Sequence, residues 1–64
     1  MVANKVKERR EQLGMTQEEL SGKSGVSRTM ISKLETNQKV DCKLSTLKAL
    51  ADALEQTISE IFLQ

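Results

Sequence analysis

Apolar residues recur along this chain three and four positions apart, which is the period of an α-helix that buries one face. On this pattern we predict helices over residues 3–13, 16–23, 27–35, 44–54 and 57–63. No stretch shows the strict alternation of apolar and polar residues that is typical of a half-buried strand. The pattern therefore predicts an all-α fold, a compact arrangement of five helices.

Residues that favour helix ends flank these segments. Thr-x-x-Glu sequences at residues 16–19 and 57–60 each match a capping box, in which the threonine hydroxyl and the glutamate carboxylate each accept from the other residue's backbone amide. Ser27 is a favourable N-cap for the third helix. Gly14 and Gly25 follow the first and second helices, where a left-handed residue commonly ends a helix.

The apolar positions within the predicted helices indicate which faces are buried. Leucine and alanine at helical spacing define the fourth helix: Leu44, Leu47, Leu50, Ala51 and Leu54. Gly22 interrupts the second helix, at a cost of about 1 kcal/mol relative to alanine. We expect a close approach of another backbone to explain it.

With 64 residues, the chain is long enough for one domain, which we place at 1–64, and for only a modest core. It contains no histidine and one cysteine, Cys42, so neither an internal disulfide nor a zinc site is expected. Cys42 is either a half-buried or loop thiol without a role, or a redox sensor. Without a histidine base or a glycine-rich phosphate loop, we expect no enzyme and no cofactor.

No apolar run is long enough for a membrane span, and the first five residues lack the apolar segment of a signal peptide. We therefore expect a cytoplasmic protein without a membrane partner. Residues 23–43 carry net positive charge and residues 44–64 net negative charge. A polyanion would meet the basic segment and avoid the acidic tail.

Two short helices joined by a glycine-containing turn are typical of a helix-turn-helix. Leu20 and Ser21 precede Gly25 and Val26, and Ile31 follows at the spacing that would hold two helices at a steep angle. Each of these residues is ordinary on its own, but the whole set in this order is specific.

The chain resembles the phage repressor and Cro-like family of helix-turn-helix proteins, also called the Xre family. The resemblance lies in residues 9–20 (RREQLGMTQEEL), 24–27 (SGVS), 31–35 (ISKLE) and 46–54 (TLKALADAL). It implies a five-helix, repressor-like DNA-binding domain and control of transcription. The chain departs from the family pattern where Gly22 replaces a helix former, and where Asn37 and Glu55 stand at or near positions commonly held by glycine.

The outer face of the third predicted helix is the candidate surface for reading DNA bases. On a helical wheel that advances about 100° per residue, Ile31 and Leu34 define the buried side. The opposite side carries cationic and hydroxyl side chains, which suit the donor and acceptor pattern of the major groove. The candidate base contacts on this side are Thr29, Ser32 and Lys33. Arg28 is a further candidate, because its long side chain, at the start of the helix, can reach toward the groove.

The resemblance also implies contacts to DNA phosphates. Gln17 begins the second helix, where free amides and a partial positive charge favour an anion. The other candidate phosphate contacts are Ser27, Arg10, Asn37, Lys39 and Lys43. In the resembling family an arginine late in the first helix pairs with a glutamate that ends the recognition helix, so we expect an ion pair between Arg10 and Glu35.

Besides a double-stranded operator, the expected partner is a second copy of the chain. We expect a homodimer through the last helix, whose apolar residues are Ile58, Ile61, Phe62 and Leu63. A protein-interaction bundle without DNA binding is the alternative from another class. Within the DNA-binding class, the residues do not separate a phage or plasmid repressor from an antitoxin or a restriction-modification controller.

Overall fold

Five α-helices are present in the residues that the computed structural model describes, 4–38 and 40–62. They are α1 (Val6–Gln12), α2 (Gln17–Ser24), α3 (Arg28–Glu35), α4 (Leu44–Ala53) and α5 (Ile58–Phe62). The predicted all-α class and the order of five helices are confirmed over this part of the chain. The bounds of α2, α3 and α4 differ from the prediction by one residue at most at either end.

The start of α1 differs more from its prediction, because residues 4 and 5 bind to distant elements instead of continuing the helix. Asn4 Oδ1 accepts from the backbone N–H of Val6 at 3.0 Å, and Asn4 Nδ2 donates to the carbonyl of Leu34 at 2.9 Å. The backbone N–H of Lys5 donates to the carbonyl of Ile61 at 2.8 Å. The start of the chain is thereby tied to α3 and to α5. Residues 1–3 and 63–64 lie outside the described part.

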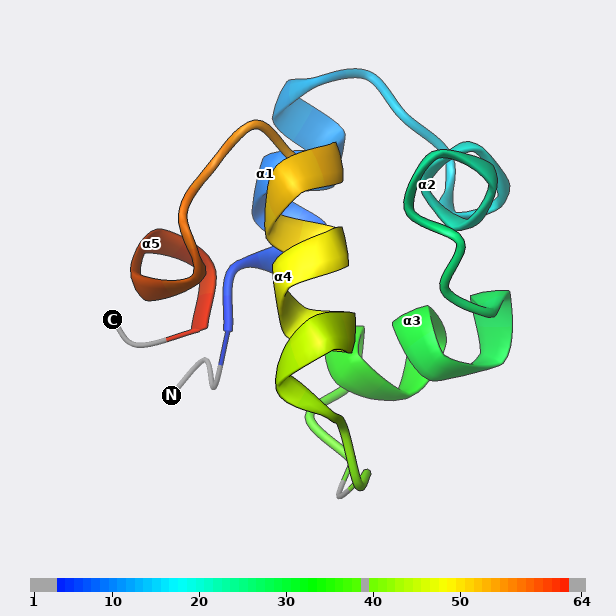
Figure 1. Ribbon diagram of the computed structural model, residues 1–64. Helices are drawn as coiled ribbons and strands as arrows, with labels where there is room; N and C mark the ends of the chain where they lie inside the picture. Colours follow the sequence, from blue (N-terminus) through cyan, green and yellow to red (C-terminus); the bar gives the residue numbers. More distant parts are fainter. Residues whose placement is uncertain (1–3, 39, 63–64) are drawn as a thin grey trace.

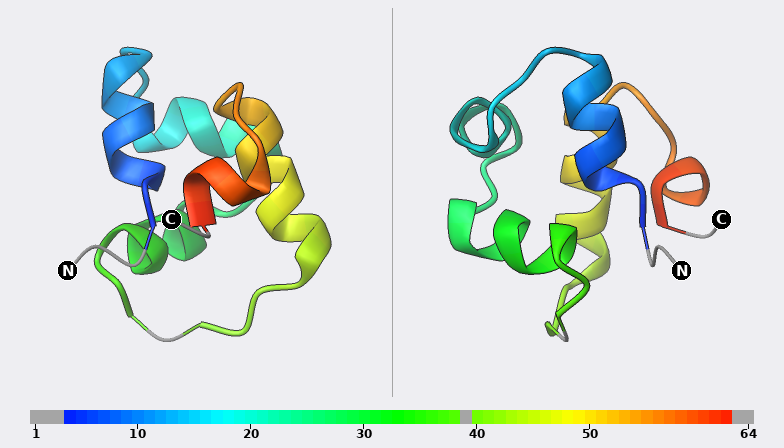
Figure 2. Two further views of the ribbon diagram at one scale, coloured as in Figure 1. Left: turned by 90° about the vertical axis from the view of Figure 1, so that its left-hand side faces the viewer. Right: turned by 180° about the vertical axis from the view of Figure 1, so that it is seen from behind.

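Helix α4 runs through the middle of the molecule, with α2 on one side and α5 on the other (Figure 1). Helix α3 lies below α2 in the same view and packs against it. The buried apolar side chains come from all five helices and from the turn before α3: Val6, Leu20, Val26, Ile31, Leu34, Leu50, Ala51, Ala53, Leu54 and Ile61. The two further views in Figure 2 show that α1 and α5 lie beside each other.

The position of Leu44 corrects the expected apolar face of α4. Leu44 is 70% exposed, whereas Leu50 and Leu54 are fully buried. Leu44 is the first residue of α4, beyond the point at which the other helices cover it. Helical spacing identifies a face, but it does not show where along that face the packing stops.

Gly22 lies inside α2 and Gly25 ends it, and of these two only Gly25 has a backbone conformation that favours glycine. Gly25 ends α2 with φ of 76°, a left-handed conformation that favours glycine. An added Cβ at Gly22 would meet no atom within 4 Å. The expected close approach of another backbone to Gly22 is therefore wrong within the described residues.

Replacing Gly22 with alanine is expected to stabilise the protein. Gly22 lies inside α2 with open space around it, so alanine would add helix propensity without a clash. We expect a gain of about 0.5–1 kcal/mol in the free energy of unfolding, which raises Tm by several degrees in a domain of this size. Thermal unfolding followed by circular dichroism checks this. An unchanged or lower Tm would contradict the open environment of Gly22.

Two residues without the freedom of glycine adopt left-handed backbone. Asn37 has φ of 60° and Glu55 has φ of 59°. These are the loop positions at which the sequence departs from the glycines of the resembling family. Asparagine tolerates this conformation better than glutamate, because its short side chain can form local hydrogen bonds. The two turns thus keep a left-handed geometry without glycine.

Candidate nucleic-acid interface

Hydrogen bonds at the helix ends set the limits of the helix-turn-helix. Thr16 Oγ1 accepts from the backbone N–H of Glu19 at 3.0 Å, and Glu19 Oε1 accepts from that of Thr16 at 2.9 Å. This is the predicted capping box at the start of α2. Ser27 Oγ caps α3 by accepting from the backbone N–H of Met30 at 3.2 Å. Both caps lie on short sequence patterns, which is why these helix starts could be predicted.

Serine hydroxyls close the turn between α2 and α3. Ser21 Oγ donates to the carbonyl of Val26 at 2.6 Å, and Ser24 Oγ accepts from the backbone N–H of Val26 at 3.1 Å. The fully buried side chains of Leu20 and Ile31 lie on the core-facing sides of the two helices. The turn is thus held by polar bonds and the helices by apolar packing, so that α3 is presented in a fixed orientation.

The outer face of α3 has the composition that the sequence predicted. Ile31 and Leu34 are buried, whereas Arg28, Thr29 and Lys33 are exposed. Ser32, the remaining candidate, is half-buried. A shallow, open hollow follows this face, and its walls are formed by Gln17, Arg28, Thr29, Ser32, Lys33 and Gln38.

This hollow combines residues from α2, α3 and the following loop. Its ionisable side chains are the cations Arg28 and Lys33, and no carboxylate lines it. The remaining side chains supply hydroxyls and amides. The surface is therefore cationic and rich in hydrogen-bond donors, as contacts to phosphates and to base edges require.

A second shallow hollow lies on the other side of Thr29 and Lys33, which line both. Its other lining residues are Ser27, Met30, Val40 and Asp41. Thr29 and Lys33 thus form a ridge between two depressions.

Gln38 is a member of the first hollow that the sequence did not indicate. Its backbone N–H donates to the carbonyl of Lys33 at 2.9 Å, and its Nε2 donates to Thr36 Oγ1 at 3.0 Å. The left-handed backbone of Asn37 turns the chain back toward the end of α3 and so brings Gln38 beside it. A turn signal at Asn37 was the only available indication.

The residues predicted to contact phosphates lie in different places. Ser27 lines the second hollow, and Lys43 is exposed at the N-cap of α4. Asn37 lines a separate groove beside α1, away from both hollows on α3. Lys39 lies outside the described residues. Contacts of these four residues with phosphate remain predictions.

Arg10 and Glu35 form an ion pair that links α1 to the end of α3. Arg10 Nε lies 2.7 Å from Glu35 Oε2, and Arg10 Nη2 donates to Glu35 Oε1 at 3.2 Å. Arg10 Nη1 donates to the carbonyl of Met15 at 2.7 Å. The side chain of Arg10 is only 12% exposed. Each of its three nitrogens has a partner within the domain, which supports a structural role, and a contact of Arg10 with phosphate stays a prediction.

Gln17 joins the same network. Its Nε2 donates to Glu35 Oε1 at 2.9 Å. Burial raises the pKa of Glu35, but hydrogen bonds from Arg10 and Gln17 and the positive charges of Arg10 and Lys7 outweigh it and leave the pKa below its ordinary value. The hydrogen bond to Glu35 also raises the pKa of Arg10. Both groups are therefore charged at neutral pH.

We expect the stability of the protein to fall in acid because of Glu35. A carboxyl whose pKa is lower in the folded chain contributes stability above its unfolded pKa, about 4.3, and loses it as the pH falls through the folded value. The free energy of unfolding should therefore decrease below about pH 5. Urea unfolding at a series of pH values measures this. The double variant Arg10→Met/Glu35→Met should show a flatter dependence, and a slope equal to that of the wild type would contradict this assignment.

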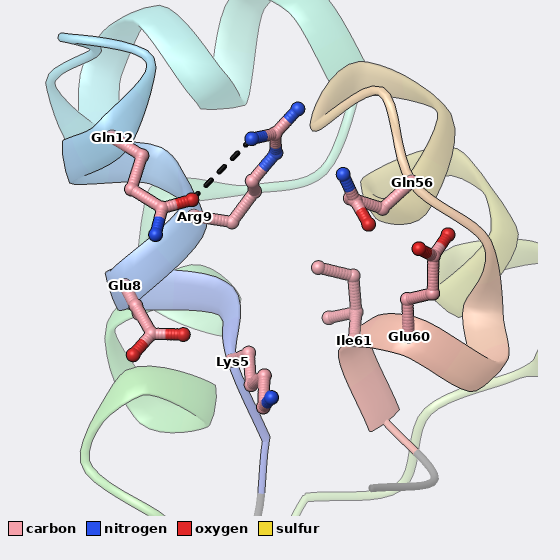
Figure 3. A pocket seen from close by; sticks show the side chains of 7 residues that line it. All are labelled: Lys5, Glu8, Arg9, Gln12, Gln56, Glu60 and Ile61. Atoms are coloured by element: carbon pink, nitrogen blue, oxygen red, sulfur yellow. Dashed lines mark hydrogen bonds between the residues drawn. The ribbon is translucent and has the colours of Figure 1, made fainter.

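A polar hollow on the far side of the molecule lies between α1 and α5 (Figure 3). Arg9 Nε donates to the carbonyl of Leu54 at 2.9 Å, and Arg9 Nη1 donates to Gln12 Oε1 at 3.3 Å. Glu60, across the hollow, accepts from the backbone N–H of Thr57 in the second predicted capping box, and this lowers the pKa of Glu60. These side chains hold helix ends in place.

The described part of the chain gives no sign of a metal centre or a membrane segment. Residues 4–38 and 40–62 contain no group of three or more histidine, cysteine or acidic side chains placed to hold a metal ion. None of the helices in these residues is long and apolar enough to span a bilayer. Cys42 is a free thiol, half-buried, with its Sγ 3.5 Å from Met30 Sδ.

An exposed cationic helix, held at a glycine turn against a capped partner helix, defines a helix-turn-helix DNA-binding protein. The model of the helix-turn-helix family matches residues 6–61, and the chain belongs to this family, in its phage repressor and Xre branch. Membership of this family makes it a DNA-binding protein.

A solved structure shares the fold. The chain superposes on a protein in the SinR protein/SinI protein complex with a TM-score of 0.81 at 24% sequence identity. The match covers 92% of this chain and 57% of the other, so this chain spans little more than half of that protein. No curated protein sequence gives a significant match.

Proposed function

We propose that this chain represses transcription by binding a palindromic double-stranded operator as a homodimer, with α3 in the major groove. The observation that supports this most is the outer face of α3, where Arg28, Thr29, Ser32 and Lys33 line one cationic hollow. Arginine and lysine donate to guanine O6 and N7, and a threonine methyl group can contact a thymine methyl group. We add Gln38 as a further residue that contacts the DNA. Such a regulator would act in the cytoplasm with the DNA.

Dimerisation through α5 is the second part of the proposal. One recognition helix reads too few base pairs for selectivity in a genome, and a symmetric dimer doubles the readout. On α5, Ile61 is buried, but Ile58 and Phe62 are only partly covered. Helix α5 lies on the side of α4 away from α2 (Figure 1), so it is available to a second copy. Leu63 lies outside the described residues.

Selection of an operator from random duplexes, followed by titration at several salt concentrations, tests the proposal. We expect affinity to fall linearly on a logarithmic scale with salt, by an amount that reflects the phosphate contacts. The selected site should contain two half-sites about 34 Å apart, each bound by one chain. Absence of binding to any duplex at low salt would overturn the DNA-binding proposal.

Sedimentation of the free protein tests the dimer separately. We expect a dimer that weakens in the variant Phe62→Ser, because Phe62 is a partly exposed apolar residue of α5. Leu44→Ser is the matched control, since Leu44 is also exposed and apolar but lies at the start of α4. A wild-type monomer at high concentration would remove α5 from the interface. An equal loss in both variants would point to a different surface.

A further inference from the structure

The most deeply buried carboxylate of the interface region is that of Glu35, whose side chain is 3% exposed. It ends α3 and accepts hydrogen bonds from side chains of two other helices, Arg10 of α1 and Gln17 of α2. The ion pair with Arg10 explains why a carboxylate can be buried here. The hydrogen bond from Gln17 is not needed for that purpose, because the arginine already pairs with both carboxylate oxygens.

Gln17 belongs to two environments at once. Its Nε2 donates to Glu35 Oε1 at 2.9 Å, and its side chain lines the cationic hollow beside Arg28 and Lys33. A glutamine amide carries two N–H donors on one planar nitrogen. Glu35 accepts one of them. It also fixes which end of the amide faces it, because a carboxylate would repel the amide oxygen.

We infer that Glu35 is a positioning residue for DNA binding: it orients Gln17 so that the second N–H of the Gln17 amide donates to a backbone phosphate. The inference rests on the proposed function of the hollow. The carboxylate also polarises the amide, which strengthens the remaining donor. Arg10 balances the charge of Glu35, so the buried carboxylate does not repel the phosphate. Since Glu35 is the last residue of α3, the phosphate donor is fixed relative to the base-reading helix.

Two matched double variants test this without leaving a buried charge unpaired. Arg10→Met/Glu35→Gln keeps an oxygen that accepts from Gln17, and Arg10→Met/Glu35→Met lacks it. We expect the second variant to bind the selected operator about fivefold to tenfold more weakly than the first, the effect of one hydrogen bond. This difference should vanish when Gln17→Ala is added to both, because the effect passes through Gln17. Equal affinity of the two folded double variants, or a difference that persists without Gln17, would overturn the inference.

A measurement on the wild-type chain decides the case in which a double variant fails to fold. In NMR spectra with labelled glutamine, one Nε2 hydrogen of Gln17 should exchange slowly with solvent in the free protein, because it donates to Glu35 Oε1, and the other should shift strongly when the operator is added. Equally fast exchange of the two hydrogens with solvent, or no shift on binding, would overturn the inference. If the wild type binds no operator, the proposed function itself fails. That outcome is distinct, because slow exchange of one hydrogen in the free protein would still report the bond between Gln17 and Glu35.

Discussion

Replacing Glu35 with alanine is expected to lower the free energy of unfolding by about 3 kcal/mol or more, which is the cost of leaving one member of a buried ion pair without its partner. Arg10, 12% exposed, would keep its charge with no carboxylate to accept from Nε and Nη2. Gln17 would lose its acceptor as well. Because small domains have only a few kcal/mol of stability, a large fraction of the variant should be unfolded at room temperature. Urea denaturation followed by circular dichroism measures the change.

The ion pair between Lys48 and Asp52 provides the control. Lys48 Nζ lies 3.4 Å from Asp52 Oδ2, but the side chains of the two residues are 67% and 64% exposed. Exposed pairs of this kind contribute about 0–1 kcal/mol, so Asp52→Ala should leave the stability nearly unchanged. If Glu35→Ala unfolds at the same denaturant concentration as Asp52→Ala, the network at Glu35 does not stabilise the fold.

Replacing Arg28 or Lys33 with alanine should weaken specific DNA binding by about tenfold to a hundredfold, equivalent to about 1–3 kcal/mol for each base contact. Both side chains are exposed on α3 and line the same hollow. The loss of Arg28 should also relax the preference at one base pair, because a bidentate contact to guanine would be missing. Fluorescence titration against the selected operator and its single-base variants measures both effects.

Lys48→Ala is the matched control for charge. Lys48 is 67% exposed on α4 and lines neither of the two hollows beside α3. Its loss should change affinity little, although it removes the same unit of positive charge. If Arg28→Ala and Lys33→Ala bind the operator as tightly as the wild type, the outer face of α3 has been misassigned. If Lys48→Ala weakens binding equally, only the net charge matters.

The helices could be predicted from the sequence because their signals are local. The capping box of Thr16 and Glu19, the cap at Ser27 and the left-handed Gly25 all lie within a few residues of the helix ends that they determine. The predicted start of the first helix, at residue 3, was wrong because Asn4 binds to Leu34, which lies thirty residues away. A periodic pattern contains no information about such contacts.

In the candidate site, too, local features could be predicted and contacts between distant residues could not. A helical wheel placed Thr29, Ser32 and Lys33 on the outer face of α3, because which side of one helix is buried depends on nearby apolar residues. Arg28 was predicted from its place at the start of the helix and the length of its side chain. Gln38 was missed, since its place in the hollow depends on how the chain turns at Asn37. The hydrogen bond between Gln17 and Glu35 was also missed, because it joins two helices across the fold. Which bases and phosphates these residues contact stays a prediction.

The residues that hold α3 to the fold and the residues proposed to contact DNA occupy different positions on the helix. Ile31, Leu34 and Glu35 hold the helix to the rest of the fold. In the described part of the chain, the side chains of Arg28, Thr29, Ser32 and Lys33 form no hydrogen bond or ion pair. Substitutions at these four outer positions should therefore cost little stability, typically within about 0.5 kcal/mol. On the proposed function, a lineage would change its target sequence through substitutions at the outer positions while the scaffold stays constant, and operator preference and folding would evolve as separate traits.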